Sequence, residues 1–291
     1  MRNCCRPSLA LAIWFLAAGA VSADDAALRQ ALIFHASFDG SADADFALGD
    51  RRIYTATSYK NRQDAQAGLH NPDVRIAPGA GRFGDALEFR RKNTKAIHFL
   101  AERNVRYWNE RWHGTVSFWL SLDPDRDLEP GFSDPIQITD KAYNDAALWV
   151  DFTKDDRPRQ FRLGVFGDLK NWNPKGLPDD KNPDFLKRLI VVAKPPFARG
   201  KWTHVVITHS GLGSGLGGYA SLYLDGRLQG ATDIIHESFN WDVKQAAIRL
   251  GVNYVGLFDD LAIFYRPLNQ QEVQALYQLP SGIKGVMPQK L

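Results

Sequence analysis

The stretch from Lys201 to Tyr277 decides the fold, because four short motifs follow one another there. They read KWTHVVITH at 201–209, ASLYLDGRLQG at 220–230, IRLGV at 248–252 and GLFDDLAIFYRPL at 256–268. The β-branched run at 205–207 suits a strand buried between two layers. Asp225 and Gly226 supply the two positive-φ positions of a type I′ turn, so they predict a hairpin.

The end of this stretch changes its hydrophobic period from 2 to 3.6 after Pro267. Asn269 is placed to cap a helix, and Glu272 stands where a capping box requires an acid. Val273, Leu276 and Tyr277 would then form one apolar stripe. The sequence therefore predicts one short helix near Asn269 to Gln278, closing a chain of strands.

These motifs, in this order and spacing, resemble the C-terminal half of the laminin-G-like, concanavalin A-like jelly roll. Two earlier segments extend the resemblance: the apolar run from Ala31 to Asp39, which ends in FDG, and GRFGDALEF at 81–89. The resemblance implies an all-β fold, a two-sheet antiparallel jelly-roll sandwich of 11 to 14 strands. This superfamily includes lectins, adhesion modules, glycanases and polysaccharide lyases, so the resemblance alone does not decide the activity.

The N-terminus has the pattern of a secretory signal peptide over residues 1–23. Arg2 and Arg6 precede an apolar run from Leu9 to Val21, and small residues follow it at 21–23. A membrane anchor is the alternative, but about 13 apolar residues are too few to span a bilayer. We therefore expect a secreted or periplasmic protein with no membrane span in the mature chain.

The rest of the chain suits one laminin-G-like domain over residues 24–280, with a polar lead-in at 24–30 and a loose C-terminal tail at 281–291. Both cysteines lie in the leader, so the mature chain has no disulfide to stabilise it. The formal charge is +3, and loss of the two leader arginines would reduce it to +1. That balance argues against a nucleic acid as partner.

Several strands alternate between an apolar face and a face that carries rings and cations. In the segment 114–122, for example, Val116 and Phe118 point one way and Trp119 the other. Sugars bind by laying apolar C–H faces on aromatic rings, so the predicted ligand-binding residues are those on the second face, which would take a glycan or a cell-surface ligand: Trp119, Trp149, Arg162 and Tyr223. The alternative is that loops and the closing helix cover these rings.

Two further segments are rich in aromatic side chains without belonging to a strand. Tyr107, Trp108 and Trp112 would either pack over the end of the sandwich or form a stacking site. The segment 168–200 departs from the compact family pattern, and its interspersed apolar residues indicate an ordered, inserted flap. Residues 211–218 contain five glycines and are typical of a mobile loop.

Catalytic machinery is not evident in the sequence, so no catalytic residue is predicted. Glycanases of this superfamily place paired carboxylates on one strand, and no such pattern occurs here. His204 and His209 are five residues apart and face opposite ways in a regular strand, which disfavours a shared zinc site. The alternatives to a non-catalytic module are a polysaccharide-degrading enzyme, a lyase using Arg162, His204 and Tyr223 or a glycanase, and a protein-binding adhesion module.

Asp259 and Asp260 lie within an apolar strand, where a carboxylate needs a partner or a metal ion. The resemblance implies a structural calcium between the first strand and this one, and the matching residues are Asp39 and Asp259. Calcium prefers six to eight oxygen ligands, so backbone carbonyls and water would complete the shell. The alternative is an arginine or a backbone amide as the partner of Asp259.

Overall fold

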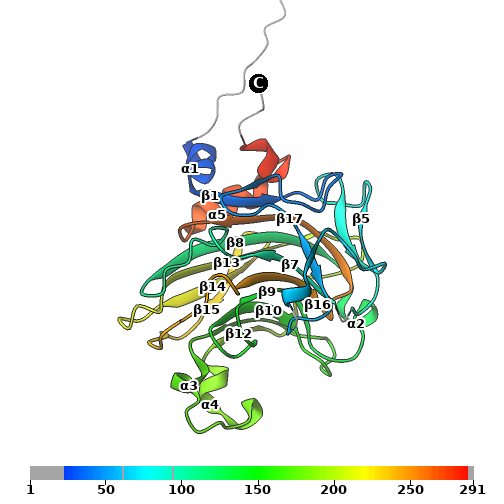
Figure 1. Ribbon diagram of the computed structural model, residues 1–291. Helices are drawn as coiled ribbons and strands as arrows, with labels where there is room; N and C mark the ends of the chain where they lie inside the picture. Colours follow the sequence, from blue (N-terminus) through cyan, green and yellow to red (C-terminus); the bar gives the residue numbers. More distant parts are fainter. Residues whose placement is uncertain (1–22, 61, 94, 288–291) are drawn as a thin grey trace, which may run out of the picture.

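The computed structural model describes residues 23–60, 62–93 and 95–287. The predicted signal peptide lies outside the described residues except for Ala23. The described chain folds into two antiparallel sheets packed face to face, with short helices outside them (Figure 1). This architecture confirms the predicted all-β sandwich. The prediction of 11 to 14 strands is too low: 17 strands occur in the described residues, of which two, β2 and β4, are only two residues long.

Sheet A has nine strands in the order β15-β14-β13-β8-β17-β1-β2, with β6 also paired to β17 and β5 to β6. Their bounds are β1 Leu32–Ala36, β2 Phe46–Ala47, β5 Val74–Ala77, β6 Ala86–Phe89, β8 Trp112–Ser121, β13 Thr203–Leu212, β14 Tyr219–Leu224, β15 Arg227–Ala231 and β17 Gly256–Phe264.

Sheet B has eight strands in the order β12-β11-β10-β9-β16-β7-β3-β4. Their bounds are β3 Tyr54–Ala56, β4 Gln66–Ala67, β7 Ala96–Leu100, β9 Ser133–Thr139, β10 Ala147–Phe152, β11 Phe161–Phe166, β12 Leu189–Val192 and β16 Ala247–Val252. The helical segments are α1 Ala23–Ala31, η1 Arg62–Asp64, α2 Pro124–Asp127, α3 Leu169–Trp172, η2 Asp179–Lys181, α4 Pro183–Leu186, α5 Gln270–Gln278 and η3 Gly282–Gly285.

The core lies between the two sheets and is built from the apolar residues that alternate along each strand. Phe118 and Phe258 stack with ring centroids 5.0 Å apart, and Phe34 meets Phe99 across the sheets at 4.9 Å. Such pairs add about 0.5–1.5 kcal/mol beyond the burial of their area. The inner faces are thus filled by side chains, which places any ligand site on an outer face or at the loops.

The two strongest local signals of the sequence form the structures they predict. Asp225 and Gly226 both have positive φ, 48° and 74°, and connect β14 to β15. The helix α5 begins after Asn269, whose side chain accepts from the Glu272 amide while the Glu272 carboxylate accepts from the Asn269 amide. This capping box fixes the start of α5, so the position of the helix over sheet A is well determined.

Helices α1 and α5 pack on the outer face of sheet A (Figure 1). Their apolar side chains join a second buried cluster with Val206 and Phe264 of the sheet and with Ile283 and Val286 of the C-terminal segment. Arg29 of α1 donates to the Val286 carbonyl at 2.5 Å. The polar lead-in at 24–30 forms most of α1. The expectation of a loose tail is wrong over its described part, because the chain from Ser281 to Met287 is held against the domain.

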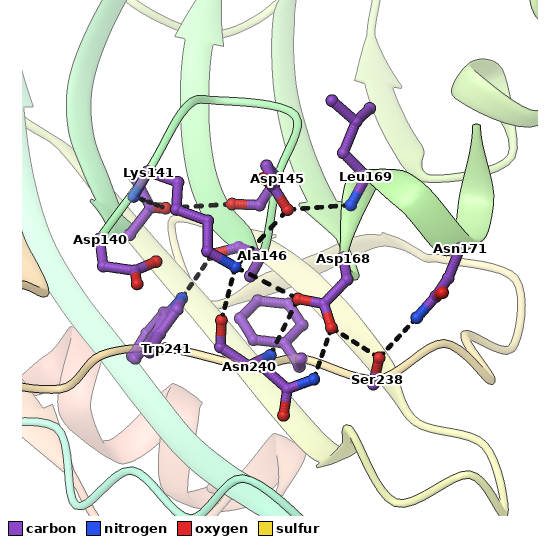
Figure 2. Close-up of polar contacts among 12 residues, drawn as sticks. Asp140, Lys141, Asp145, Ala146, Asp168, Leu169, Asn171, Ser238, Asn240 and Trp241 are labelled. Carbon is purple, nitrogen blue, oxygen red and sulfur yellow. Dashed lines mark hydrogen bonds and ion pairs between the residues drawn. The ribbon is translucent and has the colours of Figure 1, made fainter. Parts of the chain in front are cut away.

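The inserted segment 168–200 contains α3, η2, α4 and β12 and covers part of the outer face of sheet B. Trp172 and Phe185 pack with Phe166 and Trp149 of the sheet in a third buried cluster. Asp168 fixes the base of the segment by accepting from Ser238 Oγ and Asn240 Nδ2, each at 2.6 Å, with Lys141 Nζ nearby (Figure 2). These bonds tie the start of the insertion to the loop 238–241. Within the described residues, no helix is long and apolar enough to cross a membrane.

Candidate functional site

A cleft with a volume of about 1150 Å³ opens where three loops meet at one end of the sandwich. Its walls are residues 106–113, the glycine-rich loop 210–217 and the segment 265–267. The first two flank the paired strands β8 and β13, and the third follows β17. The pairing of these strands therefore brings together three loops that are far apart in the sequence.

The loop 106–113 is anchored by a cluster of buried rings. Trp112 contacts Tyr107, His209, Phe239 and Trp241 with centroid distances of 4.0 to 6.2 Å. The Tyr107 hydroxyl donates to the Phe239 carbonyl at 2.5 Å and accepts from the Trp241 amide at 3.0 Å. Tyr107 and Trp112 thus form the packed base of the loop, as one of the two interpretations of this aromatic segment predicts.

Trp108 belongs to the same loop but projects into solvent, with 65% of its surface exposed. Leu216, on the facing glycine-rich loop, is 90% exposed. Both residues line the cleft. A large ring on a rigid base beside an open cleft is suited to stacking on a flat apolar ligand face, because little conformational freedom is lost on binding.

The glycine-rich loop passes close to the neighbouring loops, and its backbone requires glycine at several positions. Gly213 has a φ of 81°, and a Cβ there would come within 2.5 Å of the Asn109 carbonyl oxygen. Gly217 has a φ of 104°, and its Cβ would approach Ile234 to 2.4 Å. Close packing thus explains two of these glycines, Gly213 against the aromatic loop and Gly217 against Ile234.

Three arginines line the cleft, and they differ in their partners. Arg266 is held by the Glu272 carboxylate through bonds of 2.5 and 2.8 Å. Arg106 lies over the ring of Tyr265, 4.5 Å from its centroid. Arg111 is exposed, and its side chain has no hydrogen bond or ion pair within the described part of the chain. Two guanidinium groups therefore remain without an acidic partner.

His113 lines the same cleft and fixes the glycine-rich loop. Its Nδ1 accepts from the Gly211 amide at 3.1 Å and lies 3.1 Å from the Ser210 hydroxyl. Burial, together with the charge of Arg111, lowers the pKa of His113. At neutral pH the ring is therefore uncharged, with Nε2 carrying the proton because Nδ1 is an acceptor.

Two of the predicted ligand residues, Trp119 and Tyr223, lie on the outer face of sheet A, where the closing helix covers them. Trp119 is only 3% exposed and packs against both His204, at 4.6 Å, and Tyr277 of α5, at 5.7 Å. Tyr223 is buried with the apolar side of α5. The prediction that these rings form an exposed binding face is wrong, because the helix occupies that face.

The other two predicted ligand residues, Trp149 and Arg162, lie on the outer face of sheet B. Trp149 is buried beside Phe166 under the inserted segment, and its Nε1 donates to the Tyr143 carbonyl at 2.6 Å. Arg162 is paired with Asp151 through bonds of 2.8 and 2.5 Å. Neither side chain is free for a ligand in this conformation, and the four predicted residues are divided between two sheets.

The division between sheets also separates the three residues named for a lyase. Arg162 is on sheet B, whereas His204 and Tyr223 are on sheet A beneath α5. Burial lowers the pKa of His204 to about 3. Since the sandwich core lies between the two sheets, these side chains cannot act on one substrate, and this assignment is wrong.

The outer face of sheet B carries a buried polar row that the strand pattern does not reveal. Arg249 donates to Gln137 Oε1 at 2.6 Å, and Gln137 donates to Asp134 at 2.9 Å. His98 lies directly across from Arg249 on β7, and burial lowers its pKa to about 4. Burial raises the pKa of Asp134 well above its usual value. The row is bonded within itself from Arg249 to Asp134, whereas Nδ1 of His98 and Nε of Arg249 are buried without a hydrogen-bond partner in the described residues.

The predicted metal ligands Asp39 and Asp259 both hold the loop 81–85. Asp39 Oδ1 accepts from the Asp85 amide at 2.7 Å, and Asp259 Oδ2 accepts from the Phe83 amide at 3.0 Å. Asp259 is fully buried, its Oδ1 has no partner, and burial raises its pKa to about 7. That free oxygen fits a cation.

Asp39 is less suited to calcium, because Lys284 of the C-terminal segment donates to its Oδ2 at 2.5 Å. Among the described residues, no group of three or more His, Cys, Asp or Glu side chains could hold a metal ion. A calcium ion bound to both acids would have to displace the Lys284 ammonium and rely on backbone carbonyls. The calcium site therefore stays a prediction.

The sequence pattern offered a stacking site as one of two interpretations of the segment that contains Trp108. It did not indicate the cleft beside this residue. Aromatic density was the signal for Trp108, and the five glycines of 211–218 were the signal for the opposite wall. No pattern linked Arg106 or Arg111 to these residues. Contact between the walls depends on strand pairing over about a hundred residues, which local sequence does not encode.

Comparisons with known proteins place this fold. The family model described as the concanavalin A-like lectin/glucanases superfamily matches residues 107–274, which include the cleft lining except for Arg106. No curated protein matches the chain. Among solved structures, domain 4 of AbnA, an extracellular arabinanase from Geobacillus stearothermophilus in complex with arabinotriose, has a TM-score of 0.54 at 17% identity, with 85% of this chain and 98% of that one covered.

Two further solved structures have the same fold at low identity. The ligand-binding domain of botulinum neurotoxin serotype D, in complex with N-acetylneuraminic acid, has a TM-score of 0.54 at 10% identity and covers 88% of this chain and 52% of that one. Trypanosoma rangeli sialidase has a TM-score of 0.50 at 16% identity, with 87% and 33% covered. The chain thus spans about half of the toxin domain and a third of the sialidase.

Proposed function

The chain belongs to the concanavalin A-like lectin/glucanases superfamily, and on that basis we propose that it is an exported, non-catalytic carbohydrate-binding domain whose ligand occupies the cleft around Trp108. The observation that carries the proposal is the position of Trp108, exposed on a rigid base and lining the loop cleft. Most large rings of the described residues are buried, and an exposed ring that lines a concave cleft is a candidate ligand contact.

The chemistry of the walls supports a sugar. The Trp108 indole offers a flat apolar surface for the C–H face of a pyranose ring, a contact of about 1 kcal/mol by analogy with aromatic pairs. Arginine side chains, the Ser210 hydroxyl and the Nε2 proton of His113 belong to residues that line the same cleft and are able to bond sugar hydroxyls. Pockets with one apolar platform and several polar groups are typical of ligand sites.

The absence of paired acids in the walls supports binding without hydrolysis. Glu110 is the one carboxylate among the described lining residues. Glycoside hydrolysis by the common mechanisms needs two carboxyl groups at a fixed separation. A bound glycan would therefore have no acid and nucleophile on either side of its glycosidic bond.

Two neighbours of the fold are in complex with sugars, arabinotriose for the arabinanase domain and N-acetylneuraminic acid for the toxin domain. They support carbohydrate as the ligand class, whereas their low identity leaves the particular sugar undefined. Export rests on the leader-like sequence at 1–23, which lies outside the described residues except for Ala23. It is tested by N-terminal sequencing of the protein recovered from the medium or periplasm.

The proposal is tested by a glycan array followed by calorimetry on the hits. We expect at least one oligosaccharide to bind, and Trp108→Ala to weaken its affinity about tenfold, equivalent to about 1.4 kcal/mol. Phe132→Ala is the matched control, because Phe132 is an exposed ring, 42% accessible, outside the cleft. Equal losses in the two variants, or binding that is unaffected by Trp108→Ala, would remove the cleft from the proposal.

An enzymatic function is distinguished by its products. Reducing-end release and absorbance near 235 nm, measured on a panel of polysaccharides, report hydrolysis and elimination respectively. We expect neither signal from the purified protein. A protein-binding adhesion module, the third alternative, would give an array without hits and no dependence on Trp108.

A further inference from the structure

The cleft has an uneven charge that goes beyond a general sugar site. Its lining contains Arg106, Arg111 and Arg266 against a single acid, Glu110. Arg266 is neutralised by Glu272, which is not part of the lining. The two positive charges of Arg106 and Arg111 thus outnumber the single negative charge of Glu110. Neither arginine makes an ion pair within the described residues.

Arg106 and Arg111 are also held near the exposed ring by their place in the loop. Arg106 has a positive φ of 43° and its guanidinium lies over Tyr265, which orients it along the cleft wall. The Arg111 amide donates to the Trp108 carbonyl at 3.2 Å, so the backbone turns back between the two residues. A guanidinium group presents its donors in a planar fork that matches a carboxylate.

We infer that the cleft selects an acidic glycan, a sugar chain that carries carboxylate groups, with Trp108 stacking on a ring and Arg111 and Arg106 binding the carboxylate. This inference rests on the proposed function and adds the ligand class to it. Arg111 is the main specificity residue, because its donors are free, whereas Arg106 is partly engaged by Tyr265. A solvated arginine pair at a cleft also accelerates the encounter with an anionic polymer.

The competing explanation is that Arg106 and Arg111 are solvated surface residues without a binding role, as most surface arginines are. Two features oppose it. Both residues line the cleft that contains the exposed Trp108. The third arginine of the same cleft, Arg266, is compensated by two short bonds to the Glu272 carboxylate. The acid that would compensate the other two is missing from the described surroundings.

The test uses a matched pair of probes, oligogalacturonate and its methyl ester, which differ in charge and share the sugar. We expect the wild-type protein to bind the acid at least tenfold more tightly than the ester at low salt. Arg111→Gln should lower the affinity for the acid by a much larger factor than the affinity for the ester, and so remove most of that preference. Trp108→Ala should weaken both probes by the same factor. Arg90→Gln is the control, because Arg90 is exposed and does not line the cleft.

The outcomes separate this inference from the proposed function. If acid and ester bind equally and both depend on Trp108, the carbohydrate site stands and the acidic preference is wrong. If Arg90→Gln reduces acid binding as much as Arg111→Gln does, the preference comes from overall charge and not from the cleft, and the inference is likewise overturned. If neither probe binds and the glycan array has no hit, both claims fail.

Discussion

Trp108 and Trp119 show how the surroundings of one side chain decide its role. Trp108 projects from a rigid loop into solvent, whereas Trp119 is enclosed by His204, Tyr277, Phe83 and the guanidinium of Arg82. The enclosure follows from α5, which begins far along the chain from Trp119. Alternation along β8 therefore indicates that Trp119 faces away from the core but not that a helix covers it.

Removing the Trp119 ring should destabilise the protein strongly. Trp119→Ala leaves a cavity under α5, and a buried tryptophan truncated to alanine costs about 3–5 kcal/mol of the free energy of unfolding. Denaturant unfolding measures this loss, with Trp108→Ala as the control that should change stability by less than about 0.5 kcal/mol. Similar small losses in both variants would mean that α5 does not cover Trp119.

The calcium prediction belongs to Asp259, whose unpartnered oxygen is buried. If Asp39 and Asp259 hold the ion, calcium raises the melting temperature of chelator-treated protein, because a ligand bound only by the native state stabilises it. We expect Asp259→Asn to lose this response. Asp155→Asn, an exposed acid paired only with Lys154, serves as the control. An unchanged melting temperature would leave Lys284 as the cation at Asp39.

Among the elements, the strands and α5 were predictable from local sequence because their signals are short. The Asp-Gly turn and the capping box each depend on a few neighbouring residues. The helices α3 and α4 have four residues each, too short for a hydrophobic period. The helix α1 is polar on most of its surface, so the sequence pattern did not predict it. In the structure its Leu28 packs in the buried cluster between sheet A and α5.

The candidate site was less predictable than the fold for a topological reason. Its walls follow β17, precede β8 and connect β13 to β14, so they meet only after the sheet has formed. Trp108 was visible as part of an aromatic segment, but Arg111 gave no signal of its own. The outward rings of the strands were the stronger sequence pattern, and in the structure they serve packing beneath α5 and the insertion.

The capping box of α5 gives a prediction at the scale of an element. Asn269→Ala removes the acceptor for the Glu272 amide, at a cost of about 1 kcal/mol in stability. Asn240→Ala gives a contrasting case, because Asn240 serves the base of the insertion through Asp168 and not α5 (Figure 2). Hydrogen exchange should rise in α5 for the first variant and in residues 168–173 for the second. The same exchange pattern in both would refute separate roles.

For the whole molecule, the stability depends on pH through buried histidines and a buried aspartate, whose pKa values are shifted in opposite directions. Burial lowers the pKa of His98 to about 4 and of His204 and His209 to about 3. In the unfolded chain these rings bind protons below about 6.5, so acidification from that pH favours unfolding. Burial raises the pKa of Asp259 to about 7, so the folded state binds this proton more tightly than the unfolded chain does. The resulting stabilisation is fully present below the unfolded pKa of Asp259 and is lost as the pH rises toward 7.

The Asp259→Asn variant should therefore lose stability more steeply on acidification than the wild-type protein. Asparagine removes the group that opposes the histidines, and one such group changes the free energy of unfolding by about 1.4 kcal/mol per pH unit between its two pKa values. Chemical unfolding at pH 4.5, 5.5 and 6.5, with chelator present, measures the difference. Parallel curves for the two proteins would show that Asp259 has an ordinary pKa in the folded state.

Binding of a glycan at the loop cleft can be followed through the seven tryptophan indoles that lie outside the predicted leader. The indole N–H resonances are recorded by NMR during titration with an oligosaccharide that the array returns, and Trp108→Phe assigns the resonance of interest. We expect the largest shift at Trp108, with the resonances of Trp119 and Trp149 unchanged because both rings are buried. A dominant shift at Trp149 with none at Trp108 would place the ligand on the outer face of sheet B and contradict the account.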